Sequence, residues 1–249
     1  MHSIAQDLRH VLRQLRHSPG FAITAVLTLA LGIGANTAIF SVMNAVLLNP
    51  SGIPRASGIV ALRARYLSAN NADLTNIPIS APDFADALHG TDTFSSAAVM
   101  ATRNYNLSGD SREPEQVPAA RVSSRYFEVF QARPALGRVF QPEEDVPGAE
   151  HEVVLSDRAW KERFGADPGI LGRSLTLDQQ AYKVIGVMGP DFAWPNAAEL
   201  WTPLALKPSV FADPQSRFNE YLTGVARLQP GKTIAAANAY LSSKAQEVQ

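Results

Sequence analysis

The 249-residue chain contains no cysteine. This absence excludes a disulfide framework, a thiol nucleophile and a metal site with cysteine ligands, although it does not select a cellular compartment. An excess of charge of either sign is also missing, because 22 basic and 23 acidic residues give a formal net charge of -1. The chain as a whole therefore exerts no general attraction on nucleic acid, and we expect no nucleic-acid partner.

Charged side chains are absent from one long segment, which runs from Phe21 to Leu48. As a helix this segment would be about 42 Å long, which exceeds the roughly 30 Å of a bilayer's hydrocarbon core. A soluble helix of that length would carry a charged face, and the apolar part of a cleavable signal peptide has only about 7 to 15 residues. We predict an uncleaved transmembrane helix with a stalk over residues 19–48.

The residues before this segment indicate its orientation. Arg9, Arg13 and Arg16 precede the predicted helix, and basic residues close to a membrane segment stay on the cytoplasmic side. We therefore expect a cytoplasmic N-terminus, a single crossing of the membrane, and an external domain over residues 49–249. Apolar side chains share one helical face of residues 1–18, which predicts a cytoplasmic amphipathic segment lying on the membrane.

Small and polar side chains inside the predicted helix suggest that it packs against another helix. Ala30, Gly34 and Ala38 recur every four residues, and such a strip lets two helices approach closely. Asn36 and Asn44 are amides that gain from a partner's hydrogen bonds, because lipid offers none. These five residues are the candidate helix-packing residues. The alternative is that glycine and alanine are simply common in membrane helices.

The external part alternates short strands and short helices, which predicts an α+β fold. Ser80 is expected to cap one helix, Ser156 or Asp157 a second that closes at Gly165, and Thr233 the last. Strands are predicted within residues 59–66, 94–107, 115–123, 152–156 and 221–228, a hairpin with its turn at 178–180 within 173–188, and helices within 79–90, 123–130, 157–165 and 233–248.

Three motifs that could carry chemistry fail on inspection. Gly231, Lys232 and Thr233 resemble the end of a phosphate-binding loop, but Ala226 stands where that loop needs its first glycine. The stretch HEVVL has Leu155 in place of the second histidine of a zinc-protease helix. The acidic stretch PEED, residues 142–145, lacks the ligand spacing of a calcium loop and is expected to be a solvated loop.

The tryptophans, Trp160, Trp194 and Trp201, are expected in the core or at an interface. No nucleophile elbow or histidine cluster occurs in the sequence. We therefore predict that the chain is not an enzyme and holds no cofactor and no metal.

Several stretches together resemble bacterial ABC transporter permeases of the MacB and FtsX-like family. They are LRHVLRQLRHSPGFAITAVLTLALGIGANTAIFSVMNAVLL, ISAPDFADAL, ARVSSRYFEVFQARPALGRVFQPEED, VVLSDRAWKERFGADPGILGRSLTLDQQAYKVIGVMGPDFAWP, LWTPLA and VARLQPGKTIAAA. The resemblance implies a first transmembrane helix followed by a MacB-like periplasmic core domain. In that domain a porter-like α/β lobe, about 50–148 and 218–249, is interrupted by a smaller, mostly β lobe, about 149–217.

The resemblance also implies a function. Family members couple ATP binding in a separate cytoplasmic subunit to motion of a periplasmic domain through stalk-like extensions of membrane helices. We therefore expect a non-enzymatic component of an efflux or lipoprotein-handling system in the bacterial inner membrane, with an ABC ATPase subunit, other permease chains and homo- or hetero-oligomers as partners. The alternative is a stand-alone, membrane-anchored periplasmic binding or scaffold protein.

Family permeases usually have at least three further membrane helices, and none follows in this sequence. We accordingly expect either a C-terminally truncated product or a chain that works beside a fuller permease. On this interpretation the last strand, within 221–228, lacks a neighbour and recruits another chain through its unpaired edge.

Overall fold

The computed structural model describes residues 20, 23–24, 26–31, 33–34, 56–66, 74–109, 112–195 and 198–247. The chain divides into two compact units, residues 1–51 and 52–249. The described residues of the first unit are helical. No helix in the described stretches has both the length and the apolar character needed to cross a membrane. The amphipathic segment predicted at 1–18 and most of the predicted membrane helix lie outside the described residues.

The second unit is built on a nine-stranded mixed sheet. Its strand order is β1-β11-β4-β5-β10-β7-β9-β6, and β8 joins β4 to β9. A separate two-stranded sheet pairs β2 with β3. The strands are β1 (Ile59–Leu62), β2 (Ala64–Tyr66), β3 (Leu74–Ile77), β4 (Phe94–Gly109), β5 (Arg112–Val122), β6 (Pro134–Gly137), β7 (Glu152–Leu155), β8 (Ser174–Leu177), β9 (Gln180–Met188), β10 (Leu200–Pro203) and β11 (Thr223–Leu228).

Six of these strands form a closed ring, in which each strand pairs with two neighbours in the ring. Pairing runs from β4 through β5, β10, β7, β9 and β8 back to β4, so that they form a small barrel. The seam between β4 and β8 is short, with the pairs Leu107↔Leu177 and Ser108↔Thr176. Closure removes exposed strand edges from this part of the sheet. The predicted division of residues 49–249 into two lobes stays a prediction.

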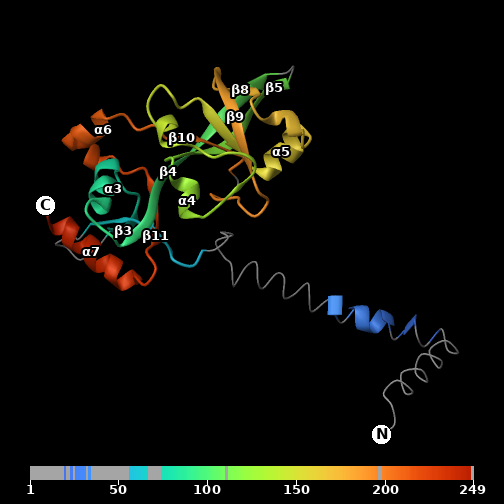
Figure 1. Cartoon of the computed structure of the whole chain (residues 1–249), viewed down its shortest axis with the longest axis horizontal. Coiled ribbons are helices and arrows are strands. Elements are labelled where there is room, and N and C mark those ends of the chain that lie inside the picture. Colours follow the sequence, from blue (N-terminus) through green and yellow to red (C-terminus); the bar gives the residue numbers. More distant parts are fainter. Residues whose placement is uncertain are drawn as a thin grey trace, which may run out of the picture. The chain divides into compact units, whose positions relative to one another are not determined.

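Most of the α-helices of the second unit lie near the two ends of the sheet (Figure 1). In Figure 1, α3, α6 and α7 lie at one end of the second unit and α5 lies at the other, beside β8 and β9. The α-helices are α3 (Ala81–Leu88), α4 (Tyr126–Val129), α5 (Asp157–Phe164), α6 (Ser209–Ala212) and α7 (Ile234–Glu247), and the short 3-10 turns are η2 (Pro142–Glu144), η3 (Pro168–Ile170) and η4 (Pro214–Phe218).

The predicted helix caps are present. The Ser80 hydroxyl accepts from the backbone N–H of Asp83 at 3.2 Å at the start of α3. Of the two candidates for α5, Ser156 is the cap, since its hydroxyl accepts from the N–H of Ala159 at 3.0 Å. Gly165 then ends α5 with φ 62°, a left-handed conformation that glycine adopts without strain.

The predicted hairpin is also present, as β8 and β9. Its turn places Asp178 and Gln179 at φ 48° and 67°, which matches the two left-handed residues of a type I′ turn. Aspartate tolerates this conformation because its side chain finds a local partner. Here the Asp178 carboxylate accepts from the N–H of Asn106 at 2.9 Å and from Arg103 at 2.6 Å, which ties the turn to β4.

Three apolar clusters fill the second unit. One is aromatic and surrounds α4, one fills the barrel, and one lies between the sheet and helices α3 and α7. Trp201 is fully buried in the aromatic cluster, and Trp194 packs against it. Trp160 packs against the barrel cluster. Trp201 is therefore a core residue, and Trp160 and Trp194 are partly buried against the core, in agreement with the prediction of core or interface positions.

The prediction that the last strand has an unpaired edge is wrong. β11 pairs with β1 on one side and with β4 on the other. The neighbour that covers it comes from the opposite end of the domain sequence, with Ile59 opposite Arg227 and Leu62 opposite Gly224. The edge strands of this sheet are instead β1 and β6, so β11 offers no edge to another chain.

Candidate functional site

Two of the five predicted helix-packing residues are described by the structure. Ala30 and Gly34 are helical and exposed, and a carbon added at Gly34 would meet nothing within 4 Å. Asn36, Ala38 and Asn44 lie outside the described residues. The packing strip therefore stays a prediction.

The segment that leads into the sheet, Ala56–Gly58, is tied to β11 and to α4. We call it the connecting segment. The Gly58 carbonyl accepts from the N–H of Leu228 at 2.8 Å. The guanidinium of Arg227 donates from Nη1 to the Ser57 carbonyl at 3.0 Å and from Nε to the Val129 carbonyl at 2.7 Å. One side chain on β11 thus joins the connecting segment to the last residue of α4.

The helix α4 is in turn fixed inside the aromatic cluster. Tyr126 is buried, its ring stacks on Trp194 with centroids 5.9 Å apart, and its hydroxyl donates to the Trp194 carbonyl at 2.8 Å. Trp201 donates to the same carbonyl at 3.2 Å. Burial raises the pKa of Tyr126 well above its usual range, so the hydroxyl stays protonated as a donor.

The acidic stretch at 142–145 is only partly the solvated loop that the sequence predicted. Glu143 is exposed, but Asp145 accepts from the N–H of Ser124 at 2.8 Å and from the N–H of Ala205 at 2.7 Å. Burial raises the pKa of the Asp145 carboxyl, and these backbone donors oppose the rise. For this residue the prediction is wrong, because its carboxylate joins two segments that lie far from it in the sequence.

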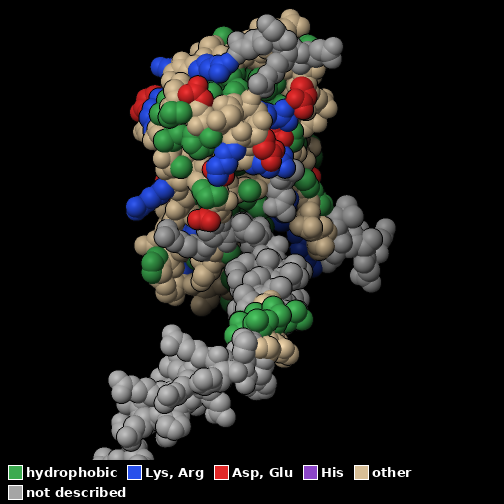
Figure 2. All heavy atoms as spheres, turned by 90° about the vertical axis from the view of Figure 1, so that its right-hand side faces the viewer, with side chains coloured by type: hydrophobic (Ala, Val, Ile, Leu, Met, Phe, Trp, Pro, Cys, Tyr) green, Lys and Arg blue, Asp and Glu red, His purple; other side chains and the backbone are tan. Residues whose placement is uncertain are grey.

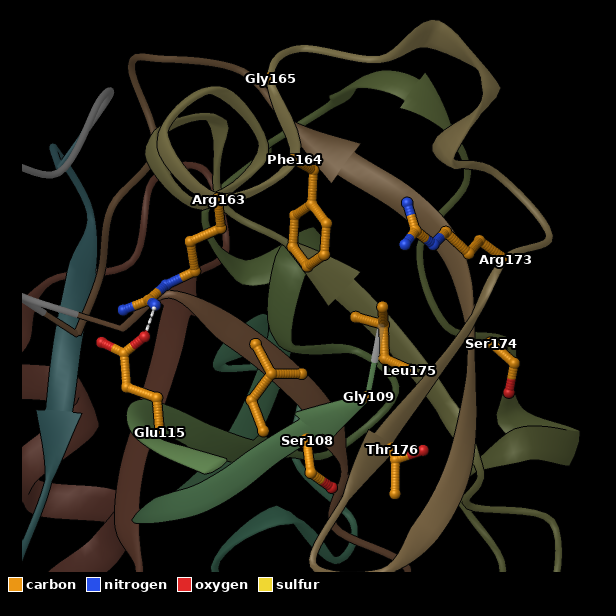
Figure 3. Close-up of a pocket in the computed structure, with 11 residues that line it drawn as sticks. Ser108, Gly109, Glu115, Arg163, Phe164, Gly165, Arg173, Ser174, Leu175 and Thr176 are labelled. Atoms are coloured by element: carbon orange, nitrogen blue, oxygen red, sulfur yellow. Dashed lines mark hydrogen bonds and ion pairs between the residues drawn. The ribbon is translucent and has the colours of Figure 1, made fainter. Parts of the chain in front are cut away.

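A pocket of about 410 Å³ opens beside the barrel seam, where β4 and β8 separate (Figure 3). Phe164 and Leu175 point toward its centre, and Ser108 and Thr176 lie on its opposite side. It is lined by Leu107, Ser108, Gly109, Glu115, Arg163, Phe164, Gly165, Arg173, Ser174, Leu175 and Thr176. Leu107, Phe164 and Leu175 provide apolar surface, and the hydroxyls and two guanidinium groups provide donors.

Ion pairs hold one wall of this pocket. Arg163 pairs with Glu115 at 2.5 Å and with Glu199, whose side chain is only 8% exposed. Arg158 binds the same Glu199 carboxylate at 2.9 Å. Hydrogen bonds to Glu199 and Glu115 raise the pKa of Arg163, so it remains charged.

The opposite wall carries Arg173, whose guanidinium lies over the Phe164 ring, 5.9 Å from its centroid.

On the side of the molecule that faces the viewer in Figure 2, Lys and Arg side chains are interspersed with Asp and Glu.

Gly231, Lys232 and Thr233, which resemble the end of a phosphate-binding loop, belong to a turn and to the cap of the last helix. Thr233 caps α7, since its hydroxyl accepts from the N–H of Ala236 at 3.2 Å, and Lys232 pairs with the exposed Asp92 at 3.0 Å. In the stretch HEVVL, the residues after His151 form strand β7 and not a helix. Among the described residues, no group of three or more His, Cys, Asp or Glu side chains is placed to hold a metal ion.

Arg227 and Glu199 were not among the residues predicted from the sequence. In each case a signal is present, because a lone charge lies in or directly before an apolar strand: Arg227 is within TGVARL, and Glu199 directly precedes LWTP. Charged residues are rarely buried unless they are paired. A single charge among strand residues therefore indicates a bonded partner, although the sequence does not say which one.

The comparison with protein families decides the classification. The family model described as MacB-like periplasmic core domain matches residues 22–244. The chain belongs to the MacB-like periplasmic core domain family. The resemblance found in the sequence is therefore confirmed, and so is the mixed α/β class of the second unit.

Individual relatives agree with this family. The macrolide export ATP-binding/permease protein MacB of Neisseria meningitidis serogroup A is 27% identical over 207 residues, which cover 81% of this chain and 30% of that protein. The same protein from serogroup B gives the same values. The chain thus spans 30% of the length of these curated relatives.

Solved structures share the fold. The periplasmic region of MacB from Actinobacillus actinomycetemcomitans has a TM-score of 0.57 at 18% identity and covers 82% of this chain and 88% of that one. The extracellular domain of the noncanonic ABC-type transporter YknZ from Gram-positive bacteria has a TM-score of 0.53 at 15% identity and covers 76% and 94%.

Proposed function

We propose that this protein is a non-enzymatic membrane component of an ABC-type transport system, for efflux or lipoprotein handling. In this proposal a membrane helix moves with the ATP cycle of a separate subunit, and the connecting segment passes that motion to the sheet of the second unit. The observation that carries the proposal is the family match over residues 22–244, which includes most of the predicted membrane segment and the whole sheet.

The described part of the first unit supports a membrane location. Its helical residues expose six large apolar side chains, which are 59% to 76% accessible: Ile23, Val26, Leu27, Leu29, Leu31 and Ile33. A soluble surface rarely exposes so many together, whereas lipid or a partner helix would cover them. We propose a single crossing of the bacterial inner membrane, with the N-terminus cytoplasmic, the second unit periplasmic, and the strip that includes Ala30 and Gly34 against another permease chain.

Affinity purification tests this function. The tagged full-length chain is purified in mild detergent from membranes of its native host after brief cross-linking, and co-purifying proteins are identified by mass spectrometry. We expect an ABC ATPase subunit, and expect that Gly34→Leu, which blocks close helix approach, lowers its recovery while Gly20→Leu does not. Recovery of the chain without any nucleotide-hydrolysing subunit would favour the anchored scaffold.

A further inference from the structure

The guanidinium of Arg227 links the connecting segment to α4 of the aromatic cluster, beside the apolar contact that Ile59 of β1 makes with the same cluster. Its position suggests how motion would pass through the second unit, an inference that rests on the proposed function. The covalent route from the connecting segment leads into β1, which is an edge strand paired only with β11 among the described strands. Backbone hydrogen bonds between β1 and β11 therefore carry displacement into the sheet.

Helix α4 contacts this route through side-chain packing and is not part of its backbone ladder. It packs on β4 and β11, and its residues belong to the aromatic cluster and not to the backbone ladder of the sheet. Arg227 contacts both α4 and the connecting segment, since it donates to the Ser57 carbonyl and to the Val129 carbonyl. The Val129 carbonyl is at the C-terminal end of α4, where a helix leaves carbonyls without intrahelical donors.

The chemistry of arginine suits this role. A guanidinium is planar, always charged, and presents several N–H donors in a fixed arrangement, so two carbonyls bound to it keep their relative position. Hydrogen bonds from a charged donor are also stronger than neutral ones. We propose that Arg227 is the positioning residue that couples the connecting segment to α4, and through α4 to the aromatic cluster.

Hydrogen exchange on the full-length chain in detergent tests this coupling, with Gly58→Ala as the perturbation. Gly58 has φ 81°, which alanine adopts only with strain, and no atom lies within 4 Å of the added carbon. The substitution therefore loosens the connecting segment without a clash. We expect amide exchange in residues 56–62 to rise, and exchange in residues 126–131 to rise with it by about threefold to tenfold.

The decisive comparison repeats this perturbation without the guanidinium. In Arg227→Met, Gly58→Ala should raise exchange in 56–62 but no longer in 126–131. Arg125→Met is the matched control, because Arg125 is also beside α4 but pairs with the exposed Glu128. In that background the effect on 126–131 should persist. If Gly58→Ala raises exchange in residues 126–131 by the same factor with and without Arg227, the proposal is wrong.

If Arg227→Met raises exchange throughout the domain, Arg227→Gln decides, because its shorter amide can reach only one of the two carbonyls. Loss of the transmitted effect in this variant supports the coupling, and its persistence refutes it. The experiment needs no ATPase. A chain that shows the coupling but co-purifies with no ATPase would thus disprove the proposed function and leave the role of Arg227 intact.

Discussion

Replacing Arg163 by methionine should destabilise the second unit more than any other single charge removal at the pocket. The change keeps much of the side-chain volume but removes the guanidinium that binds Glu199. The Glu199 side chain is 8% exposed and that of Arg163 is 19% exposed, so the pair is largely shielded from water. Removing one partner of a buried pair costs about 3–5 kcal/mol, since the other charge stays buried without compensation.

Arg158 moderates this cost. It still binds Glu199 at 2.9 Å, but its own side chain is 57% exposed and its contribution is screened by water. We therefore expect a loss of about 3 kcal/mol for Arg163→Met, at the low end of that range. Arg158→Met, the matched control, should cost less than about 1 kcal/mol.

Urea unfolding of the full-length chain in detergent measures the effect, with tryptophan fluorescence as the signal. At a slope of about 2 kcal/mol per molar urea, 3 kcal/mol lowers the midpoint by about 1.5 M. The double variant Arg163→Met/Glu199→Gln should be less destabilised than the two single variants added together, by about 2 kcal/mol. Additive effects, or equal effects of Arg158→Met and Arg163→Met, would refute the reasoning.

Five further results are expected. Asp145→Asn should lower the free energy of unfolding, measured in urea, by about 1–3 kcal/mol, because an NH2 group replaces one of the two oxygens that accept hydrogen bonds. Burial raises the pKa of Asp145 in the native state above 3.8, so the native state binds the Asp145 proton more tightly than the unfolded state does. Between the unfolded-state and native-state pKa values, the free energy of unfolding should therefore fall as pH rises. The same slope in the wild type and in Asp145→Asn would contradict this expectation. Gly186→Ala should lower the free energy of unfolding by at least about 3 kcal/mol, because its added carbon would lie 2.1 Å from the Arg138 carbonyl oxygen. In the control Gly189→Ala, the added carbon would lie 4.0 Å from the Arg133 carbonyl oxygen, and stability should change by less than about 1 kcal/mol. ATP with magnesium should not raise the melting temperature, and a rise that vanishes in Lys232→Ala would show that the turn binds nucleotide. An impermeant maleimide applied to intact spheroplasts should label a cysteine at position 111 and not one at position 3, and the reverse pattern would overturn the orientation.

Local features of the fold could be predicted from the sequence because short-range chemistry determines them. Ser80 and Ser156 are caps, Gly165 ends a helix, and Asp178 begins a tight turn, and each acts within a few residues of its own position. The family resemblance likewise depends on continuous stretches of sequence. These predictions needed no knowledge of which strands are neighbours.

Pairing between distant segments could not be predicted in the same way. β11 is covered by β1, which precedes it by more than half of the chain, and β8 closes the barrel against β4. No local pattern encodes these partners, since strand pairing depends on how the whole chain packs. Asp145 was misjudged for the same reason, because its acceptor role depends on Ala205, a residue in the segment after β10.

The central claim is that nucleotide-driven motion of the membrane part reaches the sheet of the second unit through the connecting segment. The most direct measurement places an environment-sensitive fluorophore on a cysteine at position 57, in native membranes that contain the co-purifying ATPase, with a label at position 95 as the control. Ser57 belongs to the connecting segment, whereas Ser95 is an exposed residue of β4 inside the sheet. The account predicts that ATP with magnesium changes the emission at position 57 more than at position 95, and that ADP restores it. Emission at position 57 that is the same in all nucleotide states, in membranes where the ATPase hydrolyses ATP, would contradict it.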